Sequence, residues 1–213
     1  MIRHYISKLN SFIIRKTVKY IVWDFDGTLY ENKKLGRDLQ SAFFDIAKNK
    51  DKNLTQKSFN IATEKFGSWS AAAAQLSSIP ELKVLDIVDS KINKAIYLKK
   101  NLTLVKQIES TQNQYHHLIL TNSTTAEVIS CLKKIGFNTD KKPTGPFEKI
   151  FGRDSTRLLK PNLKIYNKIL AYTKAPKFTH LFIGDSLNHD INPARLSGFQ
   201  ALPIWEINKI FKH

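Results

Sequence analysis

Three apolar runs of strand length, each followed by a polar residue, constrain most strongly what this chain can fold into. The runs are residues 20–22, 117–120 and 181–184, and the polar residues at their ends are Asp24, Thr121 and Asp185. Short apolar runs rich in β-branched and aromatic residues are typical of buried strands. The stretches between them from residue 102 onward show apolar residues at helical spacing. Strands that alternate with helices predict an α/β fold, a doubly wound parallel sheet with right-handed crossovers.

Two further strands and several helix boundaries can be placed from local signals. We expect strands at residues 147–151 and 201–204. The pattern Thr124-x-x-Glu127 predicts a helix start, and Gly136 predicts its end. Another helix is expected to begin at Lys160-Pro161, because proline is tolerated in the first turn. His116 and His117 lack partners at metal-ligand spacing, so we expect them to be solvated at the edge of the sheet.

Residues 32–100 differ in character from the rest of the chain. Their apolar residues recur only at helical spacing, and Pro80 separates two of the expected helices. The sequence therefore predicts two domains. Residues 1–31 and 101–213 form a Rossmann-like α/β core, and residues 32–100 form an all-helical insertion.

Two acids stand where the first expected strand ends. Asp24 and Asp26 are two residues apart, so both side chains can face the same side of an extended chain. Gly27 permits a sharp turn after them, and the Thr28 hydroxyl can hold that turn. Two like charges this close are costly unless a cation or a proton separates them. A calcium loop is the alternative interpretation, but the further ligands and the late Glu that it requires are missing.

The positions of Asp24, Thr121 and Asp185 support a functional interpretation of the acid pair. In parallel α/β sheets, ligands bind at the edge where the carboxyl ends of the strands meet. All three residues follow expected strands and should meet at that edge. We therefore expect a site there.

Composition narrows the class of protein. The chain has 213 residues, of which 42% are hydrophobic and 24% charged, as in a folded globular protein. No apolar run has the length of about 20 residues that spans a membrane, and the single Cys131 fits a reducing compartment. The expected location is therefore cytoplasmic. The basic N-terminal segment has some features of a transit peptide, but a short helix packed on the domain is the favoured interpretation.

The net charge of +16 raises the possibility of a polyanionic partner. However, the basic residues are scattered, and the chain has no arginine-rich block and no RNA-binding motif with aromatic residues. The sequence therefore argues against dedicated nucleic-acid binding. It gives no indication of oligomeric state.

Four short motifs in order resemble those of the haloacid dehalogenase superfamily, and specifically its phosphatase-type members with a helical cap inserted after the first strand. The resemblance runs from about Tyr20 to Ile204, with the cap matching only in character. The motifs are residues 24–28, Thr121-Asn122, Lys160-Pro161, and Gly184-Asp185-Ser186 with Asp190. Each motif alone is weak, but four in order on the expected elements are specific.

The resemblance implies phosphoryl transfer through an aspartyl-phosphate. Asp24 would be the nucleophile, since a carboxylate attacks phosphorus without a separate base. Asp26 would protonate the leaving oxygen and then deprotonate the attacking water. The implied Mg²⁺ ligands are Asp24, the backbone carbonyl of Asp26 and Asp185, with Asp190 in the outer sphere around the ion.

The resemblance also implies how the phosphate is held. Lys160 would supply a positive charge, and Thr121 a hydroxyl with adjacent backbone N–H groups. Asn122 and Ser123 would add further donors at a helix start. Trp69, Phe66 and Tyr97 are candidates for a substrate-facing surface of the cap.

Several activities remain open on this core. Members that cleave carbon–halogen bonds lack the second acid, so Asp26 argues against a dehalogenase. A phosphosugar mutase, a phosphonatase with a cap lysine, and a basic nucleic-acid-associated binding protein are the alternatives. The favoured expectation is a Mg²⁺-dependent phosphatase of a small phosphorylated metabolite, such as a nucleotide or a sugar phosphate.

Overall fold

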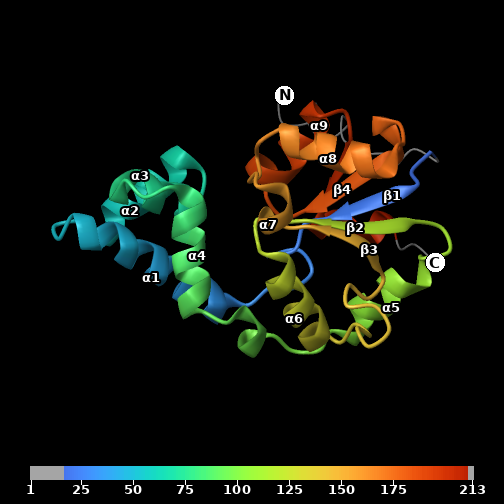
Figure 1. Ribbon diagram of the computed structural model, residues 1–213, viewed down its shortest axis with the longest axis horizontal. Coiled ribbons are helices and arrows are strands. Elements are labelled where there is room, and N and C mark those ends of the chain that lie inside the picture. Colours follow the sequence, from blue (N-terminus) through green and yellow to red (C-terminus); the bar gives the residue numbers. More distant parts are fainter. Residues whose placement is uncertain (1–16, 211–213) are drawn as a thin grey trace, which may run out of the picture. The chain divides into compact units, whose positions relative to one another are not determined.

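A computed structural model describes residues 17–210 and divides them into two compact units (Figure 1). One unit comprises residues 17–31 and 100–210, and the other comprises residues 32–99. The predicted basic N-terminal helix falls on residues outside this described range. Among the described residues, no helix is long and apolar enough to cross a membrane.

The first unit is built on a five-stranded sheet in the order β3-β2-β1-β4-β5, with every pair of neighbours parallel. Val22 in the central strand pairs with Leu118 of β2 and with Phe182 of β4. This order makes β1 the central strand. The strands are β1 (Tyr20–Trp23), β2 (His116–Leu120), β3 (Phe147–Phe151), β4 (His180–Gly184) and β5 (Gln200–Pro203).

Helices cover both faces of this sheet. Figure 1 shows α8 and α9 on one face and α5 and α6 on the other. The predicted doubly wound α/β fold is therefore confirmed. The helices are α5 (Leu102–Ser110), α6 (Thr125–Ile135), α7 (Arg153–Thr156), α8 (Lys164–Thr173) and α9 (Asn192–Leu196), and the short helical turns are η3 (Lys177–Thr179), η4 (Leu187–Ile191) and η5 (Ile204–Lys209).

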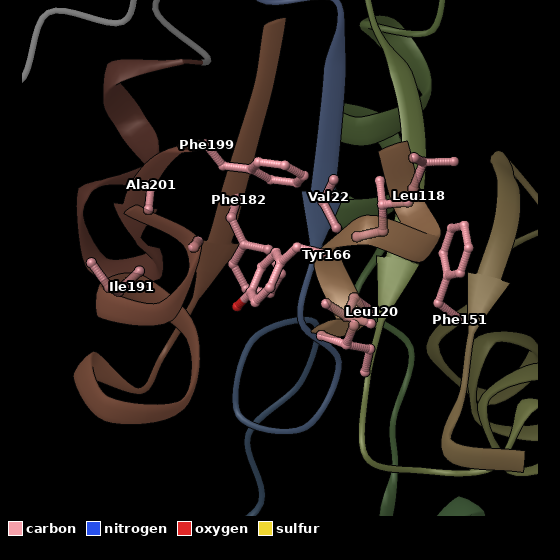
Figure 2. Packing of buried hydrophobic residues seen from close by; sticks show 12 residues of the cluster. Val22, Leu118, Leu120, Phe151, Tyr166, Phe182, Ile191, Phe199 and Ala201 are labelled. Atoms are coloured by element: carbon pink, nitrogen blue, oxygen red, sulfur yellow. The ribbon is translucent and has the colours of Figure 1, made fainter. Parts of the chain in front are cut away.

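The core beneath α8 is aromatic. The Tyr166 ring of this helix lies edge-on to Phe182 of β4 and to Phe199, which immediately precedes β5, with ring centroids 5.9 Å and 5.4 Å apart (Figure 2). Val22 and Leu118 from the same sheet face join them. Fully burying side chains of this size contributes on the order of 2 kcal/mol each, so this face anchors the strands whose ends carry the polar residues.

The boundaries of α6 agree with its local signals, but the expected start of α8 is wrong. The Thr124 hydroxyl accepts the Glu127 N–H at 3.3 Å, and Gly136 ends α6 with φ +111°. In contrast, α8 begins at Lys164 rather than at Lys160. The Asn162 side chain accepts the Lys164 N–H at 2.9 Å, and such a local side-chain bond competes with helical pairing. Lys160 is therefore left in a turn ahead of the helix.

The two histidines at the start of β2 have different surroundings. His116 is exposed, as expected, and its ring contacts Glu148. His117 is buried, so its expected solvation is wrong. Successive side chains of a strand point to opposite faces. His117 consequently faces the core side, where the indole N–H of Trp23 donates to its Nδ1 at 3.0 Å.

The structure describes every residue of the second unit, residues 32–99, and all of its regular elements are helices. Its helices pack around a cluster that includes Phe43, Phe59 and Val88. Trp69 is partly buried against this cluster, whereas Phe66 is 37% exposed. The role of the unit as a cap stays a prediction. Its elements are α1 (Lys33–Lys50), α2 (Gln56–Phe66), α3 (Trp69–Ser77), α4 (Glu81–Lys91) and the 3₁₀ turn η2 (Lys94–Tyr97).

Candidate active site

The polar residues predicted to share one edge of the sheet directly follow three neighbouring strands. Asp24 follows β1, Thr121 follows β2, and Asp185 follows β4. Because β1 lies between β2 and β4, Asp24 is central. Because the strands are parallel, their carboxyl ends lie at the same edge of the sheet. Three residues that are far apart in the sequence therefore meet in one site.

Asp24 is buried and held from three directions. Its backbone N–H donates to the Ile183 carbonyl at 2.8 Å, which continues the pairing of β1 with β4. The Thr28 hydroxyl donates to one carboxylate oxygen at 2.9 Å, and the Lys160 ammonium donates to the other. Burial raises the pKa of Asp24, and the positive charge of Lys160 opposes that increase. The lysine therefore favours the ionised carboxylate that a nucleophile requires.

Lys160 bridges two buried carboxylates. Its ammonium contacts Asp24 and lies 2.6 Å from an Asp190 oxygen, and the Lys160 side chain is 5% exposed. Burial alone lowers the pKa of Lys160, but Asp190 and Asp24 outweigh it and raise the pKa. The lysine is thus charged across the physiological range and neutralises part of the acidic cluster.

Three carboxylates form a group that fits a hard metal ion. Asp24, Asp185 and Asp190 each offer one oxygen, and these oxygens lie within 4.8 Å of one another. Mg²⁺ prefers oxygen ligands of this kind. The structure thus places Asp190 in the group itself, where it also accepts the Ser186 N–H at 3.0 Å.

Two glycines leave room for these acids. Gly27 has φ +81°, and a Cβ on it would overlap the Asp185 carboxylate. A Cβ on Gly184 would lie 2.5 Å from the Cβ of Asp190. Real Cβ atoms do not approach this closely, so both positions require glycine for the acids to converge.

Thr121 and Asn122 occupy the loop after β2. The Thr121 hydroxyl oxygen accepts the Ser123 N–H at 3.0 Å. The Asn122 side chain pairs with the Lys160 backbone, donating to its carbonyl at 3.2 Å and accepting its N–H at 2.7 Å. The Asn122 side chain thereby joins the turn that contains Lys160 to the loop after β2. Because this side chain is already paired, only the backbone N–H of Asn122 is left to donate to a phosphate.

Asp26 contacts the loop that follows β2. The Tyr30 hydroxyl donates to one oxygen of Asp26, and the Ser123 hydroxyl donates to the other at 2.7 Å. Neither contact was expected from the sequence, which indicated Ser123 as a donor at a helix start. No local pattern signals either contact, because one depends on a turn and the other joins residues that are 97 positions apart.

Arg153 also supports the site, although it belongs to none of the four sequence motifs. It follows β3 and is 4% exposed. Its guanidinium donates to the Asn122 carbonyl at 3.1 Å, and its backbone N–H donates to the Ser123 carbonyl at 3.1 Å. Arg153 therefore holds the β2 loop in place from the β3 side.

A cavity of about 350 Å³ lies beside the loop that carries the acids. It is within the size range of small-molecule sites. Gly27 and Thr28 line it together with Trp205, which is 62% exposed. The first turns of α5 contribute Asn101, Thr103 and Gln107.

Comparisons with solved structures reveal the same fold. YfnB of Bacillus subtilis, solved bound to magnesium, is 16% identical, covers 92% of this chain and 99% of its own, and has a TM-score of 0.53. CbbY of Rhodobacter sphaeroides, solved with xylulose-(1,5)bisphosphate, is 16% identical over 87% of this chain and 85% of its own, with a TM-score of 0.64.

A dehalogenase has the same fold. L-2-haloacid dehalogenase of Xanthobacter autotrophicus is 15% identical over 86% of this chain and 76% of its own, with a TM-score of 0.53. A comparison with curated proteins found no match. The model of the family described as haloacid dehalogenase-like hydrolase matches residues 21–204, which include all the site residues described above. The chain therefore belongs to the haloacid dehalogenase-like hydrolase family.

Proposed function

We propose that this chain is a Mg²⁺-dependent phosphatase that hydrolyses a small phosphomonoester through an aspartyl-phosphate. The observation that carries the proposal is the pair of carboxylates with different surroundings. Asp24 contacts the Lys160 ammonium, and Asp26 contacts two neutral hydroxyl groups. A halide leaves as a stable anion, whereas an alkoxide leaves readily only when it takes up a proton. The second carboxylate therefore favours oxygen leaving groups over halides.

In the first step, Asp24 attacks the phosphorus. One Asp24 oxygen forms a bond to phosphorus, and the bond between phosphorus and the leaving oxygen breaks. The leaving oxygen keeps the electron pair of that bond and takes a proton from Asp26. The product alcohol departs, and the phosphoryl group remains on Asp24.

The second step releases phosphate. Asp26 accepts a proton from water as the water oxygen forms a bond to phosphorus, and the bond between Asp24 and phosphorus breaks. Asp24 is restored as a carboxylate and Asp26 as a carboxylic acid. One residue thus serves as acid and then as base, which requires that its carboxyl group stay in one place.

The charge that develops on the phosphoryl oxygens needs donors that are already in position. Lys160 supplies a positive charge next to the nucleophile. The Thr121 hydroxyl and the backbone N–H groups of the β2 loop would supply further donors. Asp24, Asp185 and Asp190, with the backbone carbonyl of Asp26, would hold Mg²⁺, which supplies positive charge against the repulsion between the substrate phosphate and the acids.

The class of the substrate is inferred from the comparisons with solved structures. CbbY, a relative in fold, was solved with a sugar bisphosphate, and this is consistent with a phosphorylated sugar or nucleotide as substrate here. A cytoplasmic location belongs to the same proposal, since such metabolites and a reducing environment occur there.

The test is phosphate release from nucleotides, sugar phosphates and p-nitrophenyl phosphate, measured with Mg²⁺ and with a chelator. We expect release that depends on the metal and that Asp24→Asn abolishes, because an amide cannot attack phosphorus. The matched control is Asp140→Asn, which removes an acid from the 138–146 loop outside the site. No release by a folded, metal-loaded protein would contradict the proposal. Isomerisation of a sugar phosphate, or cleavage of a phosphonate, would replace it with the corresponding activity.

A further inference from the structure

The Asp26 carboxylate is held on both of its oxygens by hydroxyl groups. The Tyr30 hydroxyl donates to Oδ1, and the Ser123 hydroxyl donates to Oδ2 at 2.7 Å. A carboxylate with one hydrogen bond can still turn about its terminal torsion, which has a broad energy profile. Two donors that reach it from different loops fix both its position and its plane.

Each donor is itself fixed. The Tyr30 ring lies edge-on to Phe25 with centroids 5.3 Å apart, and a backbone bridge joins Tyr30 to Asp26. Ser123 is 2% exposed, and its backbone contacts Thr121 and Arg153. The backbone of Ser123 and the ring of Tyr30 are therefore both held in place beside Asp26.

The donors to the two acids differ in charge. Asp24 accepts from the Lys160 ammonium as well as from the Thr28 hydroxyl, whereas the Tyr30 and Ser123 donors to Asp26 are neutral hydroxyl groups. These two contacts therefore hold the Asp26 carboxyl group in place without adding a formal charge beside it.

We propose that Tyr30 and Ser123 are positioning residues that hold the Asp26 carboxyl group in one place while it gives a proton to the leaving oxygen and takes one from water. The inference rests on the proposed phosphatase activity. In the forward step, the bond between phosphorus and the leaving oxygen breaks, and the proton of Asp26 goes to that oxygen. In the second step, the proton returns from water to Asp26.

The kinetic test uses two aryl phosphates that differ in their need for a proton. Phenyl phosphate has a poor leaving group and depends on the acid, whereas p-nitrophenyl phosphate has a good one. For Tyr30→Phe and Ser123→Ala we expect kcat/KM to fall about tenfold or more on phenyl phosphate, which is part of the contribution of about 10²–10⁴-fold that a general acid makes, and to change little on p-nitrophenyl phosphate. The matched control is Tyr20→Phe, which deletes the same hydroxyl group at the opposite end of β1.

Equal losses on both substrates, or no loss on either, would overturn the inference. The structural test is independent of activity and consists of crystal structures of the wild type and of the double variant Tyr30→Phe/Ser123→Ala. We expect the Asp26 carboxylate to be ordered in the first and to be displaced or in several conformers in the second. An unchanged carboxylate in the double variant would also overturn the inference. If the wild type hydrolyses neither phosphate, the phosphatase proposal fails and the crystal structures still decide whether Tyr30 and Ser123 position Asp26.

Discussion

The two ends of the same parallel sheet bury ionisable groups in opposite ways. At the carboxyl end, the carboxyl groups of Asp24 and Asp190 are buried in contact with the Lys160 ammonium. At the amino end, His117 and His180 are buried among aromatic rings and hydrogen-bond partners, and burial lowers the pKa of both. Tyr20, at the start of β1, stacks on His180 with ring centroids 4.8 Å apart.

Under the proposed function, the groups at the carboxyl end take part in the reaction and those at the amino end only pack. Buried charges are expensive and persist where they compensate one another. A neutral histidine carries an aromatic ring with one hydrogen-bond donor and one acceptor, so it can be buried without a charged partner. We therefore expect changes at the carboxyl end to alter both turnover and stability, and changes at the amino end to alter stability alone.

The largest effect is expected for Lys160→Ala. The substitution leaves Asp24 and Asp190 facing each other without their shared cation. Breaking a buried ion pair by removal of one partner typically costs about 3–5 kcal/mol of folding free energy. Hydrolysis should be lost as well, because the donor next to the nucleophile is gone. Urea denaturation and phosphate release measure the two effects.

The matched control is Lys164→Ala, which removes an exposed lysine from the start of α8. It should change neither stability nor turnover measurably. Binding to a polyanion should weaken equally and slightly in both variants, since each loses one charge from a net charge of +16. Strong polyanion binding that persists in Lys160→Ala, together with no phosphate release by the wild type, would support the nucleic-acid interpretation instead.

A smaller effect at the amino end depends on pH. Burial, with a contribution from His116, lowers the pKa of His117 from 6.5 to about 4. The Trp23 indole already donates to His117 Nδ1, so a proton at that nitrogen would displace this bond. Because the unfolded chain binds the proton more readily, stability is complete above about pH 6.5 and is lost as the pH falls towards about 4. The loss approaches about 3 kcal/mol.

Denaturation midpoints between pH 7 and pH 4.5 measure this loss. His117→Asn should be less stable at neutral pH and should show a shallower dependence on pH. His116→Asn should change the slope only slightly, because burial and not the His116 charge makes the larger contribution to the lowered pKa of His117. An identical slope in the wild type and in His117→Asn would contradict the assignment of the acid sensitivity to this ring.

The sequence predicted the carboxyl end of the sheet better than the amino end. The sequence places three polar residues together, because each directly follows a short apolar run and parallel strands end at the same edge of the sheet. These residues are Asp24, Thr121 and Asp185. The burial of His117 was also within reach, since strand alternation puts it on the same face as Ile119. Its polar character led to the wrong expectation of solvation.

The contacts that complete the site could not be read from local patterns. The Asn122 side chain pairs with the Lys160 backbone 38 positions away, and the Ser123 hydroxyl reaches Asp26 from another loop. Such contacts depend on how loops of different strands meet. The predicted start of α8 is wrong for a related reason. A proline after Lys160 is compatible with a helix start, but the Asn162 side chain sets the start at Lys164.

The smallest effect is expected for Tyr20→Leu, which tests whether the amino end is purely structural. The Tyr20 ring stacks between His116 and His180, at centroid distances of 4.9 Å and 4.8 Å, and His180 stacks in turn on Phe199 at 4.7 Å. Leucine keeps an apolar side chain in the strand but removes the stacked ring. Aromatic pairs contribute about 0.5–1.5 kcal/mol beyond their buried area, so we expect a loss of about 1 kcal/mol.

Calorimetry and steady-state kinetics on the same Tyr20→Leu sample separate the two readouts. In a chain of 213 residues, a loss of this size lowers Tm by about 2–4 °C. The values of kcat and KM should equal those of the wild type, because Tyr20 begins the strand whose opposite end leads into Asp24. A fall in kcat at unchanged Tm would show that a change at the start of β1 alters the position of Asp24 at its other end. The two ends of the sheet would then be coupled, and the amino end would no longer count as inert packing.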